Sequence, residues 1–153
     1  MIYNLQVRKS KVTFHVNHLN ETSLEGATVV TKQTKADFPF GCGMNHHILT
    51  NIEYQKWFAS RFKYTTFTNE MKWYSTEKIQ GQENYTIPDA MLKFAKENGI
   101  SVRGHAILWD DKRFQPQWVK SLSPEELREA AAKRMKSVVS RYSGQLIAWD
   151  GML

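Results

Sequence analysis

A chain of 153 residues, 41% of them hydrophobic and 12% aromatic, is long and apolar enough for the core of a globular domain, which excludes a disordered tail. The net charge of +6 comes from Lys and Arg spread along the sequence, so we interpret it as a solvated basic surface and expect no nucleic-acid partner. A single cysteine excludes an internal disulfide, and no apolar run approaches the ~18 residues of a membrane span, so we expect no membrane partner.

The first part of the chain predicts two antiparallel strands within residues 8–34. Polar and apolar residues alternate from Lys11 to Val16, and a second β-prone run spans Ala27 to Thr31. The stretch between them is polar and predicts a loop. We therefore expect an N-terminal β hairpin appendage in residues 1–36, followed by the main domain in residues 37–153.

After Pro39, short apolar runs alternate with amphipathic stretches. The predicted strands are Phe40–Met44, Tyr64–Thr68, Ser101–Leu108 and Leu146–Trp149, and the predicted helices cover about 48–61, 88–98 and 124–142. Strands that alternate with helices through short connections are typical of βαβ units and a parallel sheet. The predicted fold class is therefore α/β, and such folds bind ligands beyond the carboxyl ends of their strands.

The last predicted helix has the clearest boundaries. Ser123 is the expected N-cap, Pro124 takes the first helical position, Glu126 closes a capping box and Gly144 ends the helix. Gly99 ends the preceding helix in a left-handed conformation. Apolar residues at spacings of three to four predict one buried stripe on the last helix: Leu127, Ala131, Met135, Val138 and Tyr142.

Polar and aromatic residues cluster where two predicted strands end. The residues are Asn69, Glu70, Lys72 and Trp73 after the second strand, and His105, Trp109, Asp110 and Asp111 after the third. Such groups suit a polyhydroxylated ligand, because sugar hydroxyls both donate and accept hydrogen bonds and aromatic faces cover sugar C–H patches. The alternatives are a structural ion pair between Glu70 and Lys72 and a core role for His105.

The first predicted strand is followed by two histidines. A soft-metal site made by Cys42, His46 and His47 would need a fourth ligand or a second cluster, and none is near in sequence. We therefore expect no metal and no cofactor. We expect Cys42 to pack in the core and the histidines to begin a helix.

The chain contains three ordered motifs, NEMKW at 69–73, RGHAILWDD at 103–111 and IAWD at 147–150. In this order they resemble glycoside hydrolase family ten, the endo-1,4-β-xylanases, and the phrases DFPFGCGMN, YQKWF and FTNEMKWYSTE resemble its plant branch. The match covers Lys9 to Asp150. The resemblance implies a (β/α)8 TIM barrel that acts on xylan with retention of anomeric configuration, of which this chain is the N-terminal half, about four β/α units.

The resemblance also implies a substrate-binding set for xylan or xylo-oligosaccharide. In the family, the Asn and Lys of NEMK and the His of the second motif line the sugar subsites beside the cleavage point, with the Trp next to them. The matching residues are Asn69, Lys72, His105 and Trp109. Thr68 stands where the family has an acidic residue, and Ala106 where a polar residue is usual.

No catalytic residue is assigned by the resemblance. The fourth strand of the family continues from Trp-Asp to Asn-Glu, whose Glu is the general acid/base, whereas Gly151, Met152 and Leu153 follow Asp150 here. The family nucleophile belongs to a strand farther along. Because a retaining glycosidase needs two carboxyl groups about 5 to 5.5 Å apart, we expect this chain alone to be inactive. A non-catalytic carbohydrate-binding or regulatory fragment is the alternative function.

Two further expectations follow from the resemblance. Four strands of an eight-stranded barrel have two unpaired edges, which predicts self-association. The family implies an extracellular, cell-wall location, although Met1 to Ser10 are too polar for a secretory signal. The sequons at Asn20 and Asn84 would matter only on a secretory route.

Overall fold

The computed structural model describes residues 11, 13, 26, 28–31 and 38–152. The predicted N-terminal hairpin lies mostly outside the described residues, so the hairpin and the boundary between residues 36 and 37 remain predictions. The strands are β1 (Gly41–Met44), β2 (Tyr64–Phe67), β3 (Ser101–Gly104) and β4 (Ala148–Trp149). The helices are α1 (Ile52–Ala59), α2 (Trp73–Thr76), α3 (Thr86–Glu97) and α4 (Pro124–Arg141), with 3-10 helices η2 (His46–Leu49), η3 (Lys112–Phe114) and η4 (Gln117–Ser121).

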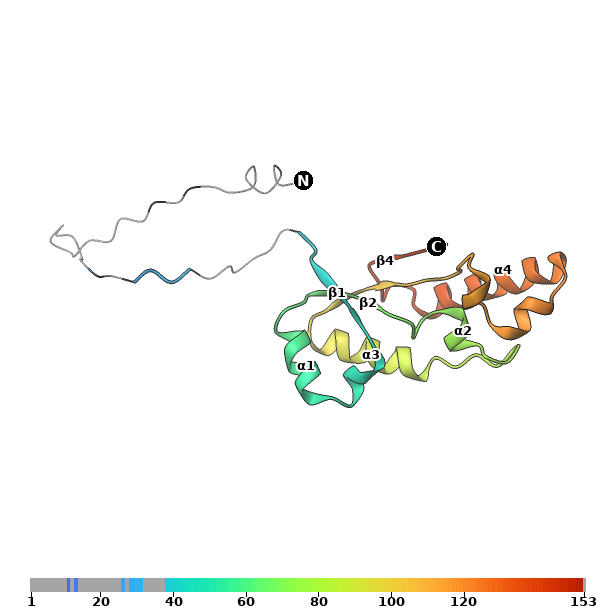
Figure 1. The fold of residues 1–153 in the computed structure, drawn as a ribbon, viewed down its shortest axis with the longest axis horizontal. Helices are drawn as coiled ribbons and strands as arrows, with labels where there is room; N and C mark the ends of the chain where they lie inside the picture. Colours follow the sequence, from blue (N-terminus) through green and yellow to red (C-terminus); the bar gives the residue numbers. More distant parts are fainter. Residues whose placement is uncertain (1–10, 12, 14–25, 27, 32–37, 153) are drawn as a thin grey trace. The chain divides into compact units, whose positions relative to one another are not determined.

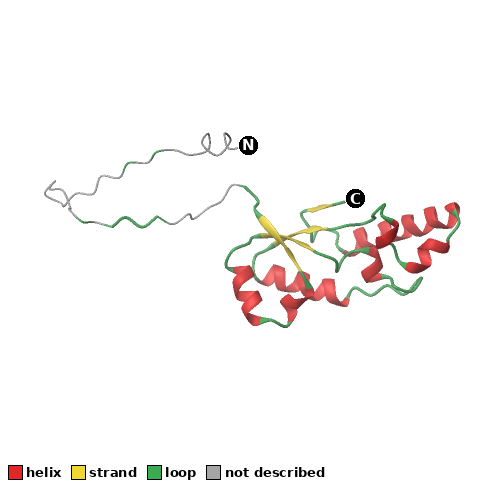
Figure 2. Ribbon diagram, viewed as in Figure 1, coloured by secondary structure: helices red, strands yellow, loops and turns green. Residues whose placement is uncertain are grey.

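The four strands form one parallel sheet in the order β1-β2-β3-β4. Each strand lies beside the next strand along the chain, and a helical segment makes each connection (Figure 1). Helices α1 and α3 lie along one side of the strands (Figure 2). The predicted α/β class with a parallel sheet is confirmed, and the carboxyl ends of all four strands meet at one edge.

The core lies between the sheet and these helices. Helix α3 is amphipathic, since its buried residues recur at helical spacing: Pro88, Met91, Leu92 and Ala95. Met91, Leu92 and Ala95 pack in one cluster with Phe67 of β2 and Val102 of β3. No helix in the described ranges has the length and apolar character needed to cross a membrane.

The helix boundaries set by local signals are confirmed. The Ser123 side chain accepts from the Glu126 backbone N–H, and the Glu126 side chain accepts from the Ser123 backbone N–H, which completes the capping box. Gly99 and Gly144 follow α3 and α4 with φ of +63° and +69°. Only glycine adopts this left-handed conformation without steric cost, so each helix ends where the sequence predicts.

The third predicted strand is too long, because β3 ends at Gly104 rather than Leu108. Its neighbour β2 ends at Phe67, so the segment beyond Gly104 has no strand to pair with on that side. Ile107 and Leu108 instead donate backbone hydrogen bonds of 3.0 Å to the carbonyls of Asp150 and Gly151. The residues after Gly104 form a loop at the carboxyl edge of the sheet.

The predicted buried stripe of α4 is wrong at two positions. Leu127 is 40% exposed and Met135 is 51% exposed, whereas Arg134 is buried in line with Val138 and Tyr142. The inward face of α4 meets backbone carbonyl oxygens of two loops, which need a donor when buried. Arg134 donates a hydrogen bond to a carbonyl of each loop. Because Arg134 faces inward, the next residue on the helix, Met135, faces outward.

Cys42 is also placed differently from the prediction. It lies in β1 between Gly41 and Gly43, and all three residues are exposed. Among the described residues, β1 is an edge strand that pairs with β2 alone, and its first three residues are exposed. The following histidines do begin a helix, the 3-10 helix η2.

Candidate functional site

The residues after each strand line up across the carboxyl edge of the sheet. Thr68 donates its backbone N–H to the Met44 carbonyl at 2.9 Å, and Asp150 donates to the Gly104 carbonyl at 2.9 Å. Gly104 and Trp149 are register partners. Because neighbouring strands are about 4.8 Å apart, the segments that start at Asn69 and His105 lie next to each other at this edge.

Lys72 lies at the centre of the polar cluster. The residue is only 8% exposed, and its Nζ is 3.4 Å from Asn69 Oδ1 and 4.4 Å from the centroid of the Trp109 ring. Burial lowers the pKa of Lys72, although the Glu70 charge acts in the opposite direction. The ammonium is thus held between an amide and an aromatic face, a geometry that a cation–π contact stabilises.

The two neighbours of Lys72 are themselves held in place. Tyr74 donates its hydroxyl to Asn69 Oδ1 at 2.7 Å, and among the described residues no hydrogen bond engages Asn69 Nδ2. Phe114 stacks on the Trp109 ring, with centroids 4.4 Å apart and an interplanar angle of 9°. The Gln115 amide donates to the Trp109 carbonyl. The cluster therefore keeps one amide donor available to a ligand.

Glu70 does not form an ion pair with Lys72, although both residues are buried and only Met71 separates them in the chain. One oxygen accepts the His46 backbone N–H at 2.8 Å, and the other accepts the Asn69 backbone N–H at 3.0 Å. The Thr68 hydroxyl lies 3.5 Å from the second oxygen. The carboxylate therefore joins the loop after β1 to the loop after β2, which is a structural role.

His105 is held by a carboxylate from the next strand. Its Nδ1 is 2.9 Å from Asp150 Oδ2, and Arg103 Nε donates to Asp150 Oδ1 at 2.9 Å. The hydrogen bond from Arg103 is the main reason why the pKa of Asp150 is lowered, although burial opposes it. With Nδ1 donating to Asp150, the Nε2 atom of His105 is the acceptor that can meet a ligand.

The structure brings three of the four predicted binding residues into contact. Lys72 contacts both Asn69 and Trp109. His105 contacts Asp150 instead, and it lies at the same edge as the other three because β2 and β3 are adjacent strands. Sequence reasoning missed Tyr74 and Phe114 as supports. Tyr74 follows Lys72 by two positions, so its place in the motif could have indicated it.

Two hollows are lined by residues that Lys72 contacts. A groove of about 1320 Å³ has Asn69, Glu70 and Tyr74 at one end and extends along the segment from Ser75 to Asp89. A smaller, more apolar hollow of about 460 Å³ is lined by Trp73, Trp109, Val119 and Leu127. The Nζ of Lys72 contacts Asn69, which lines the first hollow, and Trp109, which lines the second.

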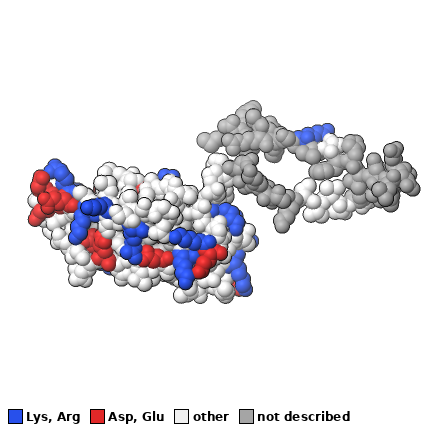
Figure 3. All heavy atoms as spheres, turned by 180° about the vertical axis from the view of Figure 1, so that it is seen from behind, with Lys and Arg blue, Asp and Glu red and all other residues white. Residues whose placement is uncertain are grey.

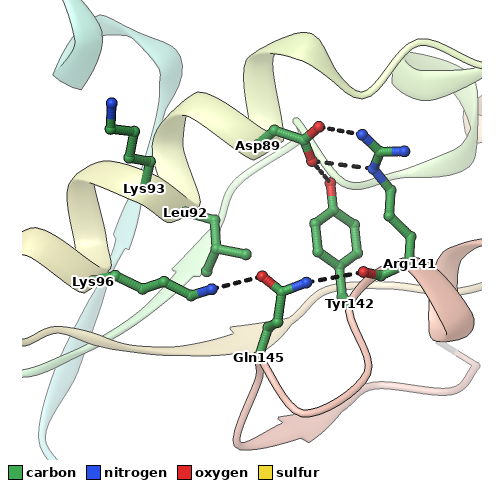
Figure 4. A pocket seen from close by; sticks show the side chains of 7 residues that line it. All are labelled: Asp89, Leu92, Lys93, Lys96, Arg141, Tyr142 and Gln145. Atoms are coloured by element: carbon green, nitrogen blue, oxygen red, sulfur yellow. Dashed lines mark hydrogen bonds and ion pairs between the residues drawn. The ribbon is translucent and has the colours of Figure 1, made fainter.

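Another pocket, of about 520 Å³, lies between α3 and the end of α4 (Figure 4). Asp89 accepts hydrogen bonds from Arg141 and Tyr142, and Lys96 donates to Gln145 Oε1 at 2.6 Å. Burial raises the pKa of Tyr142. Because these groups satisfy one another, the pocket fastens α4 to α3 and is not the better candidate for a site.

Figure 3 shows Lys and Arg interspersed with Asp and Glu over the described surface that it displays. Ion pairs within single helices join Lys56 to Glu53 at 3.0 Å and Arg128 to Glu125 at 2.7 Å. The described residues also contain no group of three His, Cys, Asp or Glu side chains that could hold a metal ion.

Comparison with known proteins gives a consistent result. The family model for glycosyl hydrolase family 10 matches residues 29–152. Endo-1,4-beta-xylanase 5-like of Arabidopsis thaliana is 55% identical over 146 residues, and endo-1,4-beta-xylanase 4 of the same plant is 51% identical over 148 residues. These alignments cover 95% and 96% of this chain but 26% of each relative. The chain thus spans about a quarter of the length of these relatives.

Solved structures match in the same region. Xylanase 10C from Cellvibrio japonicus in complex with xylopentaose has a TM-score of 0.70 and 28% identity, covering 76% of this chain and 25% of that one. Xylanase 10B from Thermotoga petrophila in complex with xylobiose has a TM-score of 0.66 and 26% identity, covering 72% and 35%. The four parallel strands and the helices that connect them therefore correspond to part of a TIM-barrel fold.

Proposed function

Because the chain belongs to glycosyl hydrolase family 10, we propose that the carboxyl edge of its sheet binds xylan or xylo-oligosaccharides. The observation that carries the proposal is the position of Lys72, whose buried ammonium is held between Asn69 and Trp109. The known structures with xylopentaose and xylobiose support the choice of ligand. The protein of which these residues form a part would be an endo-1,4-β-xylanase that acts outside the cell.

Each proposed binding residue offers a sugar a different interaction. Lys72 donates hydrogen bonds to hydroxyl oxygens, and Asn69 Nδ2 adds a second donor. His105 Nε2 accepts from a hydroxyl while Asp150 holds the ring. The Trp109 ring, stacked on Phe114 and in contact with Lys72, positions the Lys72 ammonium and offers a sugar its apolar edge. Together they provide donors, an acceptor and an apolar surface, which is what a polyhydroxylated ligand requires.

We propose that the 153-residue chain binds without cleaving. Retaining hydrolysis needs a carboxylic acid that can protonate the leaving oxygen and a second carboxylate that attacks. At this edge, both Glu70 oxygens accept backbone N–H bonds, and Asp150 is paired with Arg103 and His105. The lowered pKa of Asp150 disfavours the protonated form that a general acid needs.

The test is calorimetric titration of the 153-residue chain with xylotetraose, with a parallel assay for reducing sugar released from xylan. We expect weak binding that Lys72→Ala abolishes and no release of sugar. Lys93→Ala is the matched control, because Lys93 is 78% exposed on α3, away from the edge, and should bind as wild type. Equal binding by the two variants would refute the site, and release of reducing sugar that Lys72→Ala abolishes would refute the lack of cleavage.

We also propose that the chain self-associates through its strand edges. Within the part of the chain that the structure describes, β1 and β4 each pair on one side, and exposed apolar residues precede them, such as Phe40 (70% exposed) and Ile147 (58% exposed). Unpaired strand edges are templates for pairing with another chain. Sedimentation velocity over a concentration series should show larger species at higher concentration, and a monomer throughout would refute this.

A further inference from the structure

Arg134 is a buried cation without a carboxylate partner. It is 1% exposed in the middle of α4, and in the part of the chain that the structure describes it forms no ion pair within 4.0 Å. Burial lowers the pKa of its guanidinium, although Tyr85 and more distant acidic residues oppose this. Burying a charge destabilises a fold unless hydrogen bonds compensate for the lost water, so the groups that accept hydrogen bonds from Arg134 indicate its role.

The guanidinium uses four hydrogen bonds to join two loops. Its Nη2 donates to the Met71 carbonyl at 2.5 Å, and its Nε donates to the Ile107 carbonyl at 3.2 Å. Its Nη1 donates to the Thr76 hydroxyl at 3.1 Å and to the Tyr85 hydroxyl at 3.0 Å. Met71 lies between Asn69 and Lys72 in one loop, and Ile107 lies between His105 and Trp109 in the other.

The connection to Lys72 is short. The Thr76 hydroxyl accepts from Arg134 and lies 3.2 Å from the Lys72 carbonyl, to which it donates. Arg134 therefore holds the backbone on both sides of the Lys72 side chain, at Met71 and through Thr76. The guanidinium is a rigid planar fork, so it fixes the spacing between the two loops as well as the position of each.

We propose that Arg134 is a positioning residue for the sugar-binding edge. It holds the loop that carries Asn69 and Lys72 at a fixed distance from the loop that carries His105 and Trp109, without itself reaching the ligand. This inference rests on the proposed function for its consequence in binding. Its structural part, the coupling of the two loops, is measurable without any sugar.

The first test is hydrogen–deuterium exchange of the free 153-residue chain. Arg134→Lys keeps the charge but replaces the planar fork by donors on one nitrogen, which cannot reach both carbonyls. An unsatisfied buried carbonyl should raise exchange in residues 69–76 and 105–109 by about tenfold or more. Exchange in α1 should stay as in wild type.

The matched control is Val138→Ala. Val138 is fully buried one turn farther along α4, and its truncation weakens packing without removing a hydrogen bond. It should raise exchange across the core without selecting the two loops. If Arg134→Lys produces the same uniform pattern as Val138→Ala, Arg134 is only a structural residue and the proposal is wrong.

The second test is xylotetraose binding, measured where both variants are folded. Arg134→Lys should weaken affinity by about tenfold, whereas Val138→Ala should leave it close to wild type. Equal affinities for the two variants would overturn the role in binding. If wild type binds no xylotetraose, the proposed function fails, and the exchange result still decides whether Arg134 couples the loops.

A measurement on wild type covers the case in which Arg134→Lys does not fold. The Nε–H proton of Arg134 should exchange with water far more slowly at neutral pH than that of Arg128, whose side chain is 71% exposed. The two signals are resolved by nitrogen-edited NMR. Equal exchange rates would show that the guanidinium is not held, and would overturn the inference.

Discussion

Replacing Glu70 by Gln tests whether a buried carboxylate joins the loops after β1 and β2. The two side chains have nearly the same shape, but a carboxylate accepts at both oxygens, whereas an amide accepts at one and donates at the other. In the structure, each Glu70 oxygen faces a backbone N–H, from His46 at 2.8 Å and from Asn69 at 3.0 Å. In Glu70→Gln, one backbone N–H must therefore face an NH₂ group.

The expected cost follows from these two contacts. A buried N–H that loses its acceptor costs about 1–3 kcal/mol, and the other bond weakens by about 1 kcal/mol when its acceptor is no longer charged. The free energy of unfolding should fall by about 2–4 kcal/mol, which lowers the urea midpoint by roughly 1 to 2 M. Urea unfolding followed by circular dichroism measures this directly.

The control is Glu53→Gln on α1. Glu53 is 77% exposed and forms an ion pair with Lys56 on the same helix, so the free energy of unfolding of Glu53→Gln should stay within about 0.5 kcal/mol of wild type. If Glu70→Gln is as stable as Glu53→Gln, the backbone contacts of Glu70 do not stabilise the edge. The structural role given to this carboxylate would then be wrong.

Three further changes test other parts of the account. Gly104→Ala places a Cβ 2.2 Å from Cε3 of the Trp149 ring, so the free energy of unfolding should fall by about 1–3 kcal/mol in a urea titration. The control is Gly151→Ala, whose Cβ enters open space and should leave the free energy of unfolding unchanged. Ser123→Ala removes the N-cap of α4 and should cost about 1 kcal/mol by thermal or urea unfolding. The hydrogen bond from Arg103 is the main reason why the pKa of Asp150 is lower in the folded chain than in the unfolded chain. The stability that Asp150 contributes is therefore present above its unfolded pKa of about 3.9 and is lost as the pH falls through the folded pKa. Below about pH 4, the urea midpoint of Asp150→Asn should fall less than that of wild type.

For each of these variants, one outcome would contradict the expected effect. Equal stability of the Gly104 and Gly151 variants would show that Trp149 does not pack on β3 as described. An unchanged free energy for Ser123→Ala would mean that the capping box contributes nothing. A fall in stability between pH 5 and pH 3 that is the same for wild type and Asp150→Asn would show that this carboxylate is not linked to folding.

Local signals in the sequence were sufficient for much of the fold. Ser123, Glu126 and Gly144 set the ends of α4 because caps and left-handed glycines act within a few residues of the chain. The alternation of strands and helices likewise depends on short-range periodicity. The parallel sheet also predicts that the polar residues after β2 and β3 meet at one edge, whereas the choice of Asn69, Lys72, His105 and Trp109 as proposed binding residues came from the family resemblance.

The features that the sequence did not predict depend on distant partners. Arg134 interacts with carbonyls 27 and 63 positions away, and a backbone carbonyl leaves no mark on residue type. An apolar pattern therefore assigned the buried positions to Leu127 and Met135. The exposure of Cys42 is also a matter of tertiary structure, because it depends on which strand lies at the edge of the sheet.

The central claim, a xylo-oligosaccharide site at the carboxyl edge of the sheet, is tested most directly by NMR titration of the 153-residue chain with xylotetraose. The indole N–H signal of Trp109 should shift with increasing ligand, while that of Trp57, on α1 away from the edge, should not move. Saturable shifts at Trp109 that disappear in Lys72→Ala would support the account. No shift at millimolar ligand, or shifts at Trp57 instead, would contradict it.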